Sequence, residues 1–145
     1  MSEKEEKPRW QYRYDNFQRA VVLLREALET LEAGKMSQLE REGMIQRFEF
    51  CWELAWKTLK DYLDDQGIVL PTATPRSVIR AAHMAGILTD GDAWMAALDA
   101  RNKMSHTYNF KVFEQVVVEI QTRYMQLIEN LFDFLTDAIV TDAAK

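Results

Sequence analysis

The residues best suited to chemistry stand together in one stretch, from Arg101 to Tyr108. It contains Arg101, Asn102 and His106, and His106 is one of only two histidines in the chain. Arginine is a permanent cation whose donor fork matches phosphate oxygens, and histidine has an unperturbed pKa of about 6.5, which lets it exchange protons near neutral pH. The combination suits phosphodiester chemistry, although an arginine five residues before a histidine is by itself a common pattern.

A helix alone does not bring these side chains together. Asn102 and His106 are four residues apart and would share one helix face, whereas Arg101 lies about 100° away around the axis. The three converge most easily if the helix loosens near Ser105. The serine, threonine and asparagine of residues 105–109 favour such a break, because each can bond to backbone at a helix end. Asn102 could have either of two roles. It could orient the histidine or a phosphate, or it could make a hydrogen bond at the helix terminus.

Two carboxylates upstream are candidates for holding the arginine. Glu49, Glu53 and Lys57 follow one another at four-residue spacing, which is typical of an ordinary surface ion pair on a helix. The alternative is that Glu49 or Glu53 turns inward and fixes the guanidinium of Arg101, as supporting residues do in built sites.

The sequence predicts no metal or cofactor site. His83 and His106 are far apart, Cys51 is the single cysteine, and neither paired-cysteine nor His-Glu-x-x-His spacing occurs. No glycine-rich phosphate loop is present either. We expect His83 to be a partly buried or surface helix residue and Cys51 to be inert packing within an apolar helix.

Composition indicates one compact helical domain. The chain has 145 residues, of which 48% are hydrophobic and 28% charged, and it contains only five glycines and three prolines, too few for the many turns of an all-β fold. The 18 basic and 23 acidic residues give a net charge of −5. This charge argues against a protein that holds nucleic acid by a wide basic surface, so any RNA contact must be local.

We expect a soluble, cytoplasmic protein without membrane contact. The first seven residues, Met-Ser-Glu-Lys-Glu-Glu-Lys, lack the apolar stretch of a signal peptide. No segment reaches the roughly 18 uninterrupted apolar residues of a membrane span. A single cysteine is consistent with a reducing compartment.

The spacing of apolar residues predicts an all-α fold, an up-and-down bundle of about five helices. The first helix is expected from Asp15 to Gly34, the second from a Ser37–Glu40 capping box to about Gln66, and the third from Thr74-Pro75 to about Ala85. A capping box over residues 89–92 starts the fourth, and the last begins near Asn109. Residues 1–13 are expected to be a flexible or loosely docked lead-in, and Trp10, Tyr12 and Tyr14 suggest that it docks on the rest of the fold. Residues 14–140 are expected to be a single domain and 141–145 a frayed tail.

The second helix is apolar on more than one side. Phe50, Cys51, Leu54 and Trp56 lie partly off its main stripe. A helix of this kind is either deeply buried or has a second partner, so these residues indicate a bundle centre or a dimer surface.

These motifs together resemble one known family. The residues that carry the resemblance are Arg101-Asn102-x-x-x-His106-x-Tyr108, preceded by Gln46–Phe50, Trp52–Lys57, Thr74-Pro-Arg-Ser77 and Trp94. The chain is similar over roughly residues 12–138 to the nucleotidyltransferase substrate-binding family of the HEPN superfamily. Such proteins look like the HEPN half of two-gene toxin–antitoxin pairs whose other member is a minimal nucleotidyltransferase.

The resemblance implies a four-helix-bundle-like HEPN fold, a homodimer and a metal-independent RNase site. In that site the Arg-His motifs of two copies face one another, with Arg101, Asn102 and His106 as catalytic residues and RNA as substrate. It also implies that the partner adenylylates Tyr108 and thereby silences the toxin. The simpler role of Tyr108 is packing against the last helix. The alternatives are a non-catalytic subunit that presents a substrate to the nucleotidyltransferase and a purely structural dimer.

Overall fold

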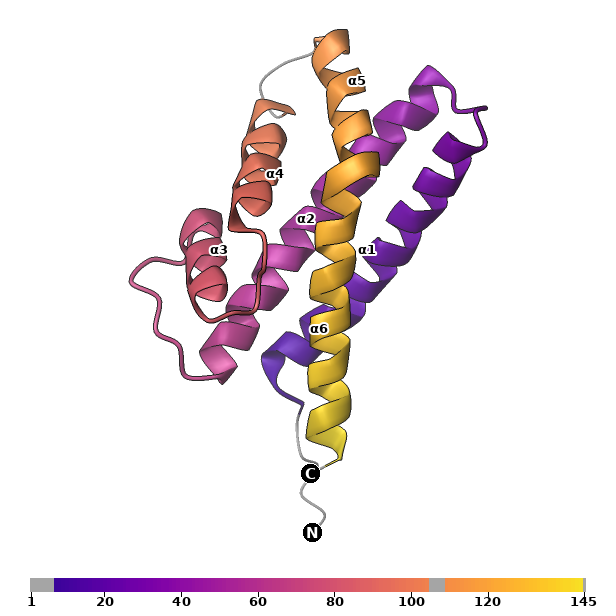
Figure 1. Ribbon diagram of the computed structural model, residues 1–145. Coiled ribbons are helices and arrows are strands. Elements are labelled where there is room, and N and C mark those ends of the chain that lie inside the picture. The colour runs from indigo at the N-terminus through magenta and orange to yellow at the C-terminus, as the bar shows by residue number, and fades with distance from the viewer. Residues whose placement is uncertain (1–6, 105–108, 145) are drawn as a thin grey trace.

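The computed structural model describes residues 7–104 and 109–144, and every regular element within these ranges is helical (Figure 1). The helices are α1 (Arg9–Glu32), α2 (Gln38–Asp65), α3 (Pro75–Met84), α4 (Gly91–Met104), α5 (Phe110–Glu119), the π-helical η1 (Ile120–Tyr124) and α6 (Met125–Ala143). Because α5, η1 and α6 follow one another without a gap, they form one long helix beside α1 and α2. The predicted all-α, up-and-down bundle is confirmed.

The first helix starts earlier than its sequence pattern predicts. The expected start at Asp15 is wrong, because α1 begins at Arg9 immediately after Pro8. Trp10 is 1% exposed, its ring packs edge-on against Tyr62 with centroids 5.1 Å apart, and its indole nitrogen donates to Asp65 at 3.3 Å. Residues 9–13 are thus helical rather than a flexible or loosely docked lead-in, and Trp10 docks as its position in that segment suggested.

Helix α2 is the element against which the others pack. It contacts α1 along their shared length and also touches α3, α5 and α6. Its start matches the prediction, since the Ser37 hydroxyl accepts from the Glu40 amide at 3.1 Å and the Glu40 carboxylate accepts from the Ser37 amide at 3.0 Å. Its end also matches, because Gly67 follows the last turn with φ +79°, a conformation that glycine adopts without strain.

The core between the long helices is aromatic and aliphatic. Phe17, Phe48, Trp52, Leu59 and Ile128 are all at most 1% exposed. Burying each such side chain contributes roughly 1.5–3 kcal/mol relative to leaving it in water, so this layer supplies much of the driving force for folding.

The four apolar residues that lie off the main stripe of α2 were predicted to face either the bundle centre or a dimer surface, and the structure divides them between buried and exposed positions. Cys51 and Trp56 are buried within the bundle and Leu54 is partly buried, which fits a bundle centre. Phe50 remains 61% exposed. Of these four residues, Phe50 is therefore the one that remains strongly exposed and available for contact with a second molecule.

Helices α3 and α4 form a short arm beside the bundle (Figure 1). Thr74 and Ser77 cap α3 reciprocally, as the Thr74-Pro75 prediction required. The predicted capping box at Thr89 is wrong: the Asp90 carboxylate accepts from the Ala93 amide at 3.0 Å, so Asp90 caps α4. Aspartate is as good a cap as threonine, and the two stand side by side in the chain.

The last helix contains a π-helical segment that the apolar spacing does not reveal. Ile120, Tyr124 and Ile128 are spaced by four residues and are all buried, which an ordinary α-helix also permits. Tyr124 stacks on Phe48 with ring centroids 5.7 Å apart. The tail predicted to fray from residue 141 remains helical to Ala143, so that boundary is also corrected.

No helix in the described ranges has the combination of length and apolar character needed to cross a membrane.

Candidate functional site

Helix α4 places Arg101 and Asn102 in its last turn. Trp94, Ala97 and Leu98 are buried and fix the helix against the rest of the fold. The C-terminal end of a helix carries partial negative charge, so a basic side chain in the last turn, such as Arg101, is electrostatically favourable there. Met104 is the last described residue of α4, so the predicted loosening of the helix beyond it stays a prediction.

Arg101 faces the carboxylates of α2. Its Nη2 atom lies 3.6 Å from Oε2 of Glu53, and the two side chains are 33% and 31% exposed. The other oxygen of Glu53, Oε1, lies 3.3 Å from Nζ of Lys57. Glu53 therefore makes both contacts that the sequence offered as alternatives: the surface pair along α2 and the link to Arg101.

Glu49 completes the acidic side of this cluster one helical turn earlier. Partial burial raises the pKa of Glu49, and the positive charge of Arg101 opposes that rise. A raised pKa means that ionised Glu49 is disfavoured here relative to water. The guanidinium of Arg101 consequently has one carboxylate at ion-pair distance and a second within electrostatic reach.

Asn102 does not share the direction of Arg101. It is exposed, and as the next residue of a regular helix it projects about 100° further around α4. Arg101 and Asn102 are thus neighbours in the chain that point to different sides of the helix end.

His106 and Tyr108 lie outside the described residues, as does the predicted loosening of the helix near Ser105. Their roles remain predictions. The chain is described again at Asn109, whose side-chain oxygen accepts from the Lys111 amide at 2.9 Å and so caps α5. In the sequence, His106 is two residues after Met104, the last described residue of α4, and Tyr108 immediately precedes Asn109.

The remaining candidates are placed away from this cluster. Cys51 is buried, and burial raises the pKa of its thiol well above the usual value, which disfavours a reactive thiolate. His83 is exposed on α3. Within residues 7–104 and 109–144 no three His, Cys, Asp or Glu side chains gather as metal ligands would.

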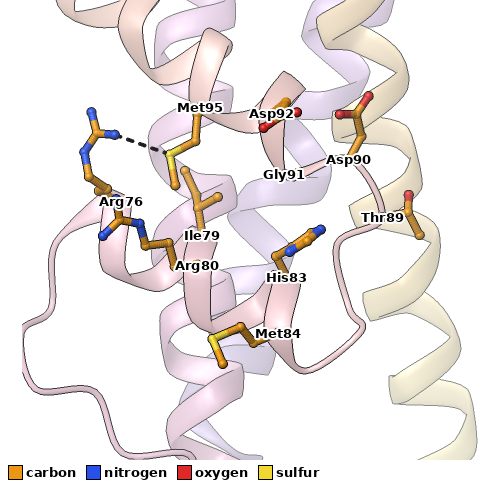
Figure 2. Close-up of a pocket in the computed structure, with 10 residues that line it drawn as sticks. All are labelled: Arg76, Ile79, Arg80, His83, Met84, Thr89, Asp90, Gly91, Asp92 and Met95. Carbon is orange, nitrogen blue, oxygen red and sulfur yellow. Dashed lines mark hydrogen bonds between the residues drawn. The ribbon is translucent and has the colours of Figure 1, made fainter.

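One cavity was not predicted from the sequence. It has a volume of about 510 Å³ and lies between α3 and the start of α4 (Figure 2). Arg76, Arg80 and His83 line it from α3. Their spacing of four and then three residues places them on one helix face and was visible in the sequence, but nothing there indicated that α4 would close the other side.

The described structure defines a class of protein, an all-α bundle with a short arm of two helices. In this class the second helix of the arm, α4, carries a half-buried arginine, Arg101, that pairs with Glu53 of the central helix α2. Residues 12–137 match the family model described as nucleotidyltransferase substrate binding protein like. The chain therefore belongs to the nucleotidyltransferase substrate-binding family, a HEPN-like family, as its motifs predicted.

A curated relative and a solved structure are among the proteins similar to this chain. The probable ribonuclease HepT of Haemophilus influenzae is 30% identical over 99 residues, which cover 66% of this chain and 60% of that protein. The chain thus matches only about three-fifths of the length of this relative. A crystal structure of a protein from Thermus thermophilus superposes with a TM-score of 0.71 at 28% identity and covers 81% of this chain and 96% of the other.

Proposed function

We propose that this protein is the HEPN-type toxin of a two-gene toxin–antitoxin pair and acts as a metal-independent endoribonuclease. The observation that carries the proposal is the placement of Arg101, fixed by Glu53 at the end of α4 and followed within five residues by His106. The similarity to a probable ribonuclease supports the same reaction class.

In the proposed reaction, His106 accepts the proton of a ribose 2′-hydroxyl as that oxygen attacks the neighbouring phosphorus. Arg101 stabilises the negative charge that builds on the phosphorane oxygens. His106 of a second copy donates a proton to the departing 5′-oxygen. The products are a 2′,3′-cyclic phosphate and a free 5′-hydroxyl, and cleavage is restricted to RNA because DNA lacks the nucleophile.

The two carboxylates beside Arg101 suit positioning better than phosphate contact. Negative Glu53 would repel an RNA phosphate, but the same charge fixes the direction of the guanidinium. Asn102, on another side of the same turn, would orient either the histidine or the phosphate. We therefore assign Arg101, Asn102 and His106 to the cutting site and Glu49 and Glu53 to its support.

The proposed site is shared between two copies in a homodimer. Phe50 is 61% exposed and lies three residues before Glu53 in α2, a spacing that makes the two side chains neighbours on the helix surface. An apolar contact for a second molecule would therefore lie beside a supporting carboxylate. Such a dimer would bring two Arg-His motifs to one cleft.

Control by the partner is proposed to act on Tyr108. A minimal nucleotidyltransferase would transfer AMP from ATP to the phenol oxygen of Tyr108, with release of pyrophosphate and loss of the phenol proton. The added phosphodiester carries negative charge two residues from His106 and would block and repel an RNA phosphate.

A second candidate function is supported by the description of the family itself. A nucleotidyltransferase substrate-binding protein would present a substrate to its partner without cutting RNA. It predicts tight association with the nucleotidyltransferase and no RNA cleavage by the pure dimer.

The decisive experiment expresses the chain with and without the nucleotidyltransferase encoded beside it and follows growth, RNA ends and peptide masses. His106→Ala should abolish toxicity and the appearance of cyclic-phosphate ends without changing the oligomeric state. Arg19→Gln, on the exposed side of α1, is the matched control and should leave both unchanged. Cleavage that persists in the His106 variant contradicts the mechanism.

The restraint is tested separately with two tyrosines. The peptide containing Tyr108 should gain the mass of AMP only when the partner is present, and Tyr108→Phe should escape neutralisation. Tyr12, which is 55% exposed, is the control, because Tyr12→Phe should still be neutralised. Neutralisation with an unmodified Tyr108 would exclude adenylylation as the restraint.

A further inference from the structure

The cavity between α3 and α4 is a second place where chemistry is concentrated. Its lining from α4 runs from Gly91 to Met95, and Arg101 lies six residues beyond Met95 on the same helix. At a rise of 1.5 Å per residue this places Arg101 about 9 Å further along the helix axis, and neither Arg101 nor Glu53 lines the cavity. The cavity is therefore distinct from the proposed cutting site.

The basic and acidic side chains that line the cavity lie on different sides of it. In Figure 2 the guanidinium groups of Arg76 and Arg80 lie together at one side, whereas Asp90 lies at the opposite side. Asp92, in the first turn of α4, also lines the cavity and lies away from the arginines. The cavity thus has a cationic end and an acidic end.

Apolar side chains lie between these ends. Ile79 is fully buried and forms part of the floor, Met95 is partly buried, and Met84 is 87% exposed at the rim (Figure 2). Methionine is flexible and polarizable and packs well against flat rings. The middle of the cavity is therefore suited to an aromatic group.

The fold positions Arg76 but engages its guanidinium only weakly. The reciprocal Thr74–Ser77 cap sets the first turn of α3, in which Arg76 stands. Arg76 lies 3.7 Å from an Asp99 oxygen and 3.7 Å from the Met95 sulfur, with the Arg76 and Asp99 side chains 49% and 64% exposed. Exposed ion pairs of this kind contribute little, so Arg76 can exchange Asp99 for an incoming anion at small cost.

A glycine makes room for the histidine of this cavity. A Cβ atom on Gly91 would meet Cδ2 of His83 at 3.0 Å and Cγ at 3.2 Å. The imidazole therefore lies directly against the first residue of α4, an arrangement that any larger residue at position 91 would disturb. The caps explain Thr74 and Ser77, but they do not account for Arg80 and His83, which line the cavity.

We propose that this cavity binds a nucleoside phosphate. The phosphate would be held by Arg76 and Arg80 through charge-assisted hydrogen bonds. The base would pack against Ile79 and Met95, and Asp92 would accept a hydrogen bond from an amino or hydroxyl group. A volume of about 510 Å³ is within the range of small-molecule sites. The proposal goes beyond RNA cleavage and does not depend on it.

The first test is calorimetric titration of the full chain with AMP, adenosine and inorganic phosphate. AMP should bind with one molecule per chain. Adenosine and phosphate, which each lack one half of the ligand, should bind at least about tenfold more weakly, the loss expected when a charged hydrogen bond or a stacked ring is removed. No binding of AMP at millimolar concentration, or equal binding of AMP and phosphate, would overturn the proposal.

Variants then locate the binding. Arg76→Gln and Arg80→Gln should each weaken AMP binding about tenfold or more, while Arg19→Gln should not. Gly91→Ala should weaken it, because the added methyl group would shift the His83 ring, which lines the cavity. Gly43→Ala is the matched control, because a Cβ there meets nothing within 4 Å. AMP-induced changes in amide NMR shifts should concentrate in residues 75–95.

If an Arg80 variant binds AMP like the original chain, or if the shift changes concentrate around Arg101, AMP does not bind in the α3–α4 cavity and the proposal is wrong.

A last experiment distinguishes two sources of the ligand, a free nucleotide and a nucleotide unit of an RNA. If a short oligoadenylate displaces AMP and binds more tightly in an Arg80-dependent way, the occupant is one nucleotide unit of an RNA. If it does not displace AMP, the occupant is a free nucleotide. Because Arg101 and His106 are unchanged in these variants, failure of the RNase proposal would remain distinguishable.

Discussion

Glu53 forms ion pairs with two basic residues, Lys57 on its own helix and Arg101 on α4. Residue spacing alone predicts the Glu53–Lys57 pair, because residues four apart are neighbours on any helix. The contact to Arg101 could be offered only as an alternative, since it depends on how α4 packs against α2. The structure contains both contacts, at 3.3 Å and 3.6 Å.

We predict that Glu53→Gln lowers the rate of RNA cleavage roughly tenfold to a hundredfold, because a guanidinium that is no longer fixed by charge is misplaced for the phosphate. The measurement is kcat/KM on a short RNA. Stability should change by less than about 1 kcal/mol, since the lost pairs are partly exposed.

Lys57→Gln is the control for this prediction, because it removes the surface pair but leaves the Arg101 contact in place. Cleavage by the Lys57 variant should match that of the original chain. Equal losses in the two variants would mean that the α2 charge ladder, rather than the hold on Arg101, is what matters.

At the scale of helices, ends with a capping side chain were predicted best. Ser37, Thr74 and Asn109 each cap the helix that the sequence assigned to them. The start of α1 was missed because its signal is not local: Arg9 to Arg13 are helical while Trp10 docks on Tyr62 and Asp65, more than fifty residues away. The α3–α4 cavity was missed for the same reason, since it exists only after two helices pack.

The two capping boxes allow a prediction about α3. Thr74→Ala and Ser37→Ala each remove an N-cap hydrogen bond and should each lower the free energy of unfolding by about 1 kcal/mol. Helix α3 has only ten residues, so its first turn should fray when the cap is lost. Denaturant unfolding measures the first effect and amide hydrogen exchange the second.

Only the Thr74 variant should also weaken AMP binding, because Arg76 stands in the frayed turn, whereas Ser37 caps a different helix. If both variants lost AMP affinity equally, general destabilisation would explain the loss and the link between the α3 cap and the cavity would be wrong.

At the scale of the whole molecule, charge limits how RNA can be held. With a net charge of −5 the protein gains nothing from general attraction to a polyanion, so binding must depend on a few basic groups placed at one point. One chain offers Arg101 and His106 only once each at the proposed site. Two copies facing one another would double them, and in the proposed mechanism each copy supplies one of the two proton-transferring histidines.

Sharing of the site between copies leads to a quantitative prediction for mixed dimers. When equal amounts of the original chain and His106→Ala pair at random, about a quarter of the dimers contain two original chains. If one histidine acts as base and the other as acid, only those dimers cut RNA, and activity falls to about a quarter of that of an equal total amount of the original protein.

Independent sites would instead leave about half of the activity, because each original chain would work regardless of its neighbour. The mixture is prepared by co-expression with two different tags, and native mass spectrometry confirms that mixed dimers form in the expected proportion. Mixing with Arg19→Gln in place of the His106 variant should leave activity undiminished. Activity near one half in a fully exchanged mixture would show that a single chain carries a complete site and would reject the shared one.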